Sequence, residues 1–337
     1  MFLNLFNTIA TMNNLYPLKF KPIYKDKIWG GQKIKTILGH DTGKIPNCGE
    51  AWLISGVEGS QTVVANGYLE GNDLSELIEV YMDELMGNKV YDRFGDEFPI
   101  LIKVLDTNDW LSVQVHPDDE MAMERHNSLG KTEMWYIMEA DQDAELICGF
   151  NQKMNKEKYV NALLDKKIPE IMNREKVKKG DVFFIPAGRV HALGPGLLLA
   201  EIQETSDVTY RIYDWDRIDA AGEFRELHTD LALDAIDFEQ QADYRTHYKE
   251  KDNETIELVS CEHFTTNTLH LKKPIEKDYE ELDSFVIYTC TVGSFRLESG
   301  DDSVEVMAGE AVLLPATTGK VNIFPHKEAR LLEVYML

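Results

Sequence analysis

Short apolar runs and stretches of apolar–polar alternation occur along most of the chain, and they predict β-strands. Val182 to Ile185 is one such run, and it ends at Pro186 and Gly188, which interrupt a strand and turn the backbone. The run from Pro99 to Leu105 is typical of a buried strand, with Lys103 as its only charged residue. The pattern favours a mainly β protein.

Two predicted strands carry polar residues that are unusual for a core. From Leu111 to His116 the chain alternates, so Ser112, Gln114 and His116 share one face, which in an ordinary half-buried strand lies in water. The run 130–139 carries Glu133 among apolar and aromatic residues. A carboxylate at such a place is costly to bury unless a cation compensates its charge.

Two more predicted strands follow the turn at Gly188, at residues 197–203 and 208–213. Alternation places Glu201 and Gln203 on one face of the first strand, and Arg211 on one face of the second. These polar residues have two interpretations. They lie on solvent-exposed faces, or the acid and the arginine point towards the same place as a nearby histidine, His191.

Helical periodicity is found in two segments. Between residues 72 and 87 apolar residues recur at helical spacing, with Asn72 or Asp73 as the N-cap and Gly87 as the stop. Residues 151–175 are polar with a short apolar stripe, and they predict a small inserted helical layer. The polar stretch 238–255 is the predicted domain boundary, and beyond it only short strands are expected.

A segment near the C-terminus, Gly309 to Ile323, repeats the pattern that begins at Gly180. Each copy has a glycine, an acidic residue, four apolar residues and a proline, and Lys320 stands where the first copy has His191. A protonated lysine is not a metal ligand. The repeat predicts a second, degenerate domain without metal at 238–337, after an extension at 1–17 and a first domain at 18–237 that includes both helical segments.

Composition and charge narrow the range of partners. At 337 residues the chain is too long for one small barrel, so two core-forming units are expected. The net charge of −24 argues against nucleic acid or an anionic membrane as a partner, and an anionic substrate would need a local cluster of Lys and Arg. The four cysteines lie far apart and predict reduced thiols in a cytoplasmic protein. We interpret residues 1–11, which are too short to span a bilayer, as a dispensable extension.

Four residues form a candidate metal site: Gln114, His116, Glu133 and His191. Two imidazoles, a carboxylate and an amide oxygen suit zinc, and also manganese, cobalt or iron. Three or four protein ligands leave room for water or substrate, which is typical of a catalytic site. A single histidine is more often a packed or surface residue, so the prediction depends on all three patterned strands meeting.

Several motifs resemble known families. The spacing G-x5-P-x-G-x2-H at 180–191 resembles a motif of the cupins, which are small β-barrels that hold a metal. The motifs QVHP at 114–117, GKTE at 130–133, PAGRVHAL at 186–193 and SDVTYR at 206–211 resemble the type I mannose-6-phosphate isomerases, especially the short bacterial form. KIWGG at 27–31 and GEAW at 49–52 fit the same family. The resemblance covers residues 18–235 with specific motifs and 256–337 only in general character.

The resemblance implies two cupin-type jelly-roll β-barrels with a small inserted helical layer. It also implies a zinc-dependent aldose–ketose isomerase that interconverts mannose 6-phosphate and fructose 6-phosphate. The zinc ligands carry over to Gln114, His116, Glu133 and His191. Arg211 matches the catalytic arginine, and Ser112, Lys103, Lys131 and Glu201 match active-site positions.

The chain departs from the family pattern in two places. Longer members have HKPE where this chain has Gly130-Lys131-Thr132-Glu133, so a mechanism with that histidine as the proton shuttle does not apply. Arg211 is followed by Ile212-Tyr213 instead of Ala-Gly, which affects the shape of the pocket.

The general base is left open between two residues. Glu201 is preferred if burial raises its pKa, and Lys131 serves if neighbouring cations lower its own. Lys103, Lys131 and Arg211, with the Ser112 hydroxyl, would bind the phosphate, because the chain has no glycine-rich phosphate loop.

Two other functions remain as alternatives. One is a cupin-type iron-dependent oxygenase, and the other is a sugar-phosphate-binding protein without turnover. The sequence leaves the oligomeric state open.

Overall fold

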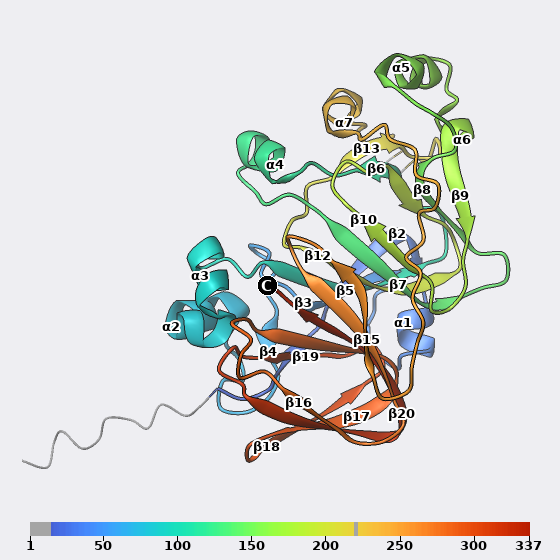
Figure 1. The fold of residues 1–337 in the computed structure, drawn as a ribbon. Helices are drawn as coiled ribbons and strands as arrows, with labels where there is room; N and C mark the ends of the chain where they lie inside the picture. Colours follow the sequence, from blue (N-terminus) through green and yellow to red (C-terminus); the bar gives the residue numbers. More distant parts are fainter. Residues whose placement is uncertain (1–14, 219–221) are drawn as a thin grey trace, which may run out of the picture.

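The computed structural model describes residues 15–218 and 222–337 (Figure 1). Twenty strands and seven short helices make up this described part, which confirms the prediction of a mainly β fold. Our interpretation of residues 1–11 concerns residues outside it. Tyr16, at the end of the predicted extension, is buried and donates a hydrogen bond to the Asn66 carbonyl at 2.6 Å, so the packed core begins before residue 18.

The strands form three antiparallel sheets, and none of them closes into a barrel within the described residues. The six-stranded sheet contains β2 (Ile23–Gly31), β3 (Cys48–Ile54), β5 (Ile100–Thr107), β7 (Glu133–Ala140), β10 (Val182–Ile185) and β12 (Leu197–Glu204). The five-stranded sheet contains β6 (Val113–Val115), β8 (Glu145–Phe150), β9 (Met172–Lys176), β11 (His191–Leu193) and β13 (Tyr210–Tyr213).

The third sheet has nine strands and contains most of the C-terminal part of the chain. Its strands are β1 (Leu18–Lys21), β4 (Val63–Val64), β14 (Thr255–Ser260), β15 (Thr265–Leu271), β16 (Ile275–Asp278), β17 (Val286–Ser299), β18 (Asp302–Met307), β19 (Ala311–Leu314) and β20 (Lys320–Tyr335).

The six-stranded sheet is the central layer, and this position explains its apolar strands. On β5, Ile102 and Val104 pack in the large core shared with the nine-stranded sheet. Leu105 packs on the opposite face, in a second core shared with the five-stranded sheet. All eight residues of β5 are buried, as are all eight of β12. A strand covered on both faces needs apolar residues at nearly every position, so the few polar residues on it stand out.

The order of strands supports the internal repeat. The order of neighbouring strands β14-β15-β20-β17-β19 in the nine-stranded sheet matches the order β3-β5-β12-β7-β10 in the six-stranded sheet. Gly180 and Gly309 precede β10 and β19 with φ of +87° and +85°, a conformation that favours glycine. His191 begins β11 as Lys320 begins β20, and Lys320 is exposed and lies 3.5 Å from Asp278.

Both copies of the repeat keep a buried carboxylate at the same register position. Glu201 on β12 lies opposite Lys103 and Trp135, as Glu333 on β20 lies opposite Asn267 and Tyr288. The candidate metal ligands differ, because Val286 replaces Glu133 at the matching position of β17. The two copies therefore share a framework of strands and a polar row, but not the candidate metal-binding residues.

The helices lie at the ends and edges of the sheets: α1 (Lys33–Thr36), α2 (Leu74–Met86), α3 (Asn88–Phe94), α4 (Asp119–His126), α5 (Lys156–Leu164), α6 (Ile168–Ile171) and α7 (Thr229–Ala235) (Figure 1). The predicted helix at 72–87 is confirmed as α2, with Asp73 as the N-cap and Gly87 as the C-cap. The helical prediction for 151–175 is wrong at its end, because residues 172–176 form the edge strand β9, which pairs with β8. None of the described helices is long and apolar enough to cross a membrane.

The proposed domain boundary at residue 238 does not separate two hydrogen-bonded units. Strand β1 pairs with both β19 and β4, so two N-terminal strands complete the C-terminal sheet. The polar stretch after residue 238 also packs on the first unit, where the Tyr248 hydroxyl donates to the Gly180 carbonyl at 2.7 Å.

Replacing Phe285 with alanine is expected to destabilise the whole protein by about 3–5 kcal/mol, the usual range for truncating a buried phenylalanine. Phe285 is fully buried, and its ring centroid lies 4.6 Å from that of Phe98, which precedes β5, so it joins the two large sheets. Urea unfolding of Phe285→Ala should show one transition, with its midpoint at a lower urea concentration than in the wild type. Phe224→Ala, which changes a side chain that is 67% exposed, should leave the midpoint unchanged. Two separate transitions in the wild type would contradict the shared core.

Candidate metal and substrate site

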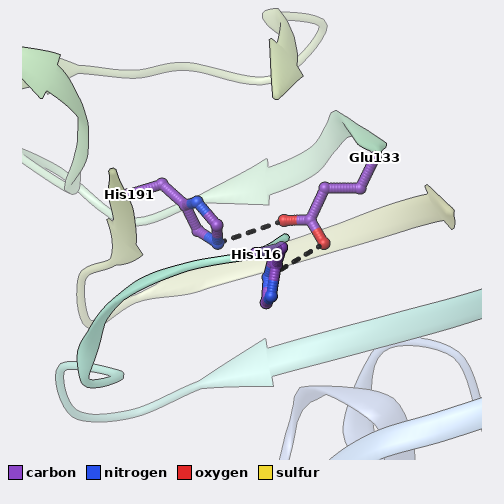
Figure 2. A group of neighbouring side chains, drawn as sticks. All are labelled: His116, Glu133 and His191. Carbon is purple, nitrogen blue, oxygen red and sulfur yellow. Dashed lines mark ion pairs between the residues drawn. The ribbon is translucent and has the colours of Figure 1, made fainter. Parts of the chain in front are cut away.

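Three buried side chains from three strand ends meet between the six- and five-stranded sheets. Figure 2 shows Glu133, at the start of β7, between His191 and His116. Glu133 Oε1 lies 3.3 Å from His191 Nε2, and Glu133 Oε2 lies 3.7 Å from His116 Nε2. The three ligand atoms lie within 4.8 Å of one another, so the structure brings together the three residues singled out in the sequence.

Both histidines are oriented by the backbone. His116 Nδ1 donates a hydrogen bond to the Val208 carbonyl at 2.9 Å, and His191 Nδ1 donates to the Arg189 carbonyl at 2.8 Å. This arrangement fixes the tautomer and leaves each Nε2 lone pair directed at Glu133. Metal-binding histidines are commonly held in this way.

The cluster contains several polar atoms without a hydrogen-bond partner. Within the described residues, His116 Nε2 and both carboxylate oxygens of Glu133 are buried and make no hydrogen bond. Burial raises the pKa of Glu133 to about 8. Burial also lowers the pKa of His191 to about 4, and that of His116 well below its usual value. Two lone pairs and a carboxylate that face one another in a dry site fit a divalent cation.

Gln114 lies beside this cluster. Its register position on β6 is opposite His191 on one side and Arg211 on the other, and its Nε2 lies 3.2 Å from His191 Nε2. The amide is therefore next to the cluster, and a rotation of the side chain would present its oxygen.

Glu201 is held in a buried ion pair on the same face of the six-stranded sheet. Its Oε1 lies 3.1 Å from Lys103 Nζ, and its Oε2 accepts a hydrogen bond from Trp135 Nε1 at 2.8 Å. Lys103 also donates to the side-chain carbonyl of Gln203. Burial alone would raise the pKa of Glu201, but Lys103 and Lys131 outweigh it and lower that pKa. The condition under which the sequence favoured Glu201 as the base is therefore not met.

Lys131 has fewer contacts than Lys103. Among the described residues, its ammonium group forms one ion pair, with Glu133 Oε2 at 4.0 Å, and its side chain lines the cavity. Burial lowers the pKa of Lys131, and the positive charge of Lys103 lowers it further.

A cavity of about 520 Å³ opens beside the cluster, and its lining is cationic on balance. Six basic side chains line it (Lys25, Lys27, Lys103, Lys131, Arg211 and Arg225) together with four acidic ones (Glu50, Glu58, Glu201 and Asp207). Ser112 and Gln114 also line this cavity. A protein with a net charge of −24 thus has a local patch suited to an anionic substrate.

Arg211 reaches the cavity from β13 and is only partly satisfied. Its Nη1 donates to the Glu226 carbonyl at 2.8 Å, and its Nε is buried without a hydrogen-bond partner among the described residues. The side chain lines the cavity, so its guanidinium lies next to the space that a ligand would occupy.

Several cavity residues, among them Trp29, Trp52 and Arg225, are not among the candidate site residues that the sequence points to. Trp29 and Trp52 are buried and also line the cavity, and Trp52 Nε1 donates to Glu50 at 2.6 Å. One signal was present, because Lys27 with Trp29 and Glu50 with Trp52 each stand two residues apart and so share a strand face.

All four cysteines lie in the described part of the chain, and each is a free thiol, as the sequence predicted.

The fold and the cluster define a mainly β protein with a buried two-histidine, one-carboxylate site beside a cationic cavity. Residues 17–162 match the family model for the catalytic domain of type I phosphomannose isomerase, and residues 254–335 match that for the cupin domain of mannose-6-phosphate isomerase. The chain belongs to the type I phosphomannose isomerase family, so the family resemblance noted in the motifs is confirmed.

Individual relatives cover almost the whole chain. Mannose-6-phosphate isomerase ManA from Bacillus subtilis is 37% identical over 93% of this chain and 97% of the relative. Mannose-6-phosphate isomerase from Streptococcus mutans is 35% identical over 89% of this chain and 93% of the relative. The crystal structure of mannose 6-phosphate isomerase from Bacillus subtilis has a TM-score of 0.84 at 32% identity, covering 96% of this chain and all of that one.

Proposed function

We propose that this chain interconverts mannose 6-phosphate and fructose 6-phosphate through an enediolate, with one divalent cation, zinc in the first instance, held by His116, Glu133, His191 and Gln114. The observation that carries the proposal is the cationic cavity that opens beside the buried cluster. When bound, the ion would supply Lewis-acid polarisation of the sugar oxygens.

The surrounding side chains have separate roles in this proposal. Lys103, fixed by Glu201, and the Ser112 hydroxyl bind and orient the anionic substrate. Arg211 donates hydrogen bonds to the oxygens that become negatively charged in the enediolate, and such a donor is worth about 3–4 kcal/mol. These groups line the cavity from two different sheets, since Lys103 lies on the six-stranded sheet and Arg211 on the five-stranded one.

The proton that moves between C2 and C1 needs a base, and we propose Lys131 for this role. Glu201 has both oxygens engaged by Lys103 and Trp135, whereas Lys131 keeps a single ion pair at 4.0 Å among the described residues. Glu201 then acts as a positioning residue for Lys103.

Replacing Lys131 with methionine is expected to lower kcat by about 100- to 10,000-fold, the usual contribution of a general base. The substrate C2 proton should then no longer exchange with deuterium from the solvent, as followed by NMR. Glu201→Gln keeps a hydrogen-bond acceptor for Trp135, and it should slow turnover while exchange continues. Exchange that survives in Lys131→Met and disappears in Glu201→Gln would instead identify Glu201 as the base.

The finer features of the fold belong to the same proposal. The repeated strand order supports two cupin-type jelly-roll barrels with degenerate metal chemistry in the second. The free thiols support a cytoplasmic location, and a small sugar phosphate is the proposed partner.

The test combines metal analysis of the purified protein with a coupled assay for fructose 6-phosphate formed from mannose 6-phosphate. We expect one divalent ion per chain, loss of turnover on chelation, and recovery on adding zinc. Unchanged ligand after incubation would favour the sugar-phosphate-binding alternative, and turnover that requires Fe(II) and oxygen would favour the oxygenase.

A further inference from the structure

The segment that carries Lys131 and Glu133 is anchored through three successive backbone N–H groups. Gly130 N donates to Asp119 Oδ1 at 2.8 Å, and Lys131 N donates to the Pro117 carbonyl at 3.1 Å. Thr132 N donates to Glu204 Oε2 at 2.7 Å. Two carboxylates and one carbonyl therefore fix the backbone on both sides of Lys131 and directly before Glu133.

This anchoring depends on the two residues by which GKTE differs from the HKPE of longer family members. Proline has no N–H, so it could not donate to Glu204 as Thr132 does. A Cβ at Gly130 would lie 2.6 Å from the backbone nitrogen of Asp119, so no histidine fits there. Gly130 and Thr132 therefore allow the hydrogen bonds to Asp119 and Glu204 that a histidine and a proline at these positions would prevent.

The two carboxylates are bridged by a histidine from the C-terminal part of the chain. His263 lies in the turn between β14 and β15, and its Nδ1 is 2.9 Å from Glu204 Oε1 and 3.8 Å from Asp119 Oδ2. Glu204 is 4% exposed. A buried carboxylate needs a positive charge nearby, and His263 would supply it when protonated, whereas within the described residues its Nδ1 makes no hydrogen bond.

We propose that Asp119, Glu204 and His263 form a positioning clamp that holds Lys131 and Glu133 in their working places. The C-terminal unit thereby supports the candidate active site through His263, although it contributes no ligand atom to the cluster of His116, Glu133 and His191. The part of this proposal that concerns turnover rests on the proposed isomerase function. The part that concerns Glu133 predicts an effect on metal affinity, and this effect does not require isomerase activity.

The test is His263→Ala, measured for turnover and for zinc affinity by competition with a chromogenic chelator. Loss of a group that orients ligands typically costs about 10- to 100-fold in metal affinity or activity. We expect kcat to fall within that range while KM for mannose 6-phosphate changes little, since Lys103 and Ser112, which bind the substrate in the proposed function, are not held by the clamp. Zinc affinity should fall as well. His263→Lys, which restores a positive charge near Glu204, should recover part of both losses.

His326→Ala is the matched control, because His326 lies in the same sheet and forms an exposed ion pair with Glu305 at 2.7 Å. It should leave kcat, KM and zinc affinity unchanged. A second pair of variants covers the case in which His263→Ala does not fold. Gly130→Ala should reproduce the kinetic defect by displacing Asp119, whereas Gly319→Ala, where the nearest atom is 3.4 Å from the new Cβ, should not.

Wild-type kcat and zinc affinity in folded His263→Ala would overturn the clamp. A second equivalent of zinc that the wild type binds and His263→Ala loses would also overturn it, by identifying the three residues as a metal site. A wild type without isomerase activity would refute the proposed function. The zinc affinities of the wild type and His263→Ala would still decide whether the clamp positions Glu133.

Discussion

Replacing His191 with alanine is expected to remove the bound metal and to lower turnover by at least about 1,000-fold, which corresponds to roughly 4 kcal/mol of lost transition-state stabilisation. His191 Nε2 lies 3.3 Å from Glu133 Oε1, and its Nδ1 is already used by the Arg189 carbonyl. Its removal therefore takes away an oriented lone pair that no neighbour replaces. Glu133 would remain buried with one imidazole, that of His116, and the Gln114 amide, which together make a poor site for a divalent ion.

The measurements are metal content by mass spectrometry and turnover by the coupled assay, with circular dichroism to show that the sheets persist. His247→Ala is the control, since that side chain is exposed and pairs with Asp243 at the surface. Full metal occupancy in folded His191→Ala would show that the cluster is not the metal site.

Replacing Arg211 with alanine is expected to lower kcat and kcat/KM together by at least about 100-fold. One of its nitrogens is held by the Glu226 carbonyl at 2.8 Å, and its Nε is buried without a partner among the described residues. In the proposed role the guanidinium donates to the negative charge that develops on the sugar oxygens in the transition state, more than to the uncharged carbonyl of the ground state. Arg211→Lys should recover little, because a point charge does not reproduce the planar set of donors.

Steady-state kinetics with mannose 6-phosphate separate the two possible roles of this arginine. A change in KM alone would make Arg211 a phosphate-binding residue, and the enediolate would need another donor. Arg296→Ala provides the control, because that arginine packs on Phe324 in the nine-stranded sheet, remote in sequence from the cavity residues. It should leave both kinetic constants unchanged.

Local patterns in the sequence were enough to predict the strands and the candidate metal residues. The run Val182 to Ile185 and the helix at 72–87 were read correctly because alternation, helical spacing and caps involve residues close together in the chain. The same applies to the repeat of Gly180 and Pro186 at Gly309 and Pro315. Edge strand β9 was missed because its residues, MNREK, are polar on the exposed side and lack the apolar signal of a buried strand.

Only the tertiary structure decided how the polar residues are paired. Glu201 meets Lys103 across 98 residues of chain and Trp135 across 66, and these contacts reverse the effect of burial on its pKa. Glu204 ends β12 of the six-stranded sheet, whereas His263 lies in the turn between β14 and β15 of the nine-stranded sheet. The sequence determined which side chains share a strand face, because that depends on the local period of the strand. The partner of each side chain, and so its charge state and role, depends on register between distant strands, which no local pattern records.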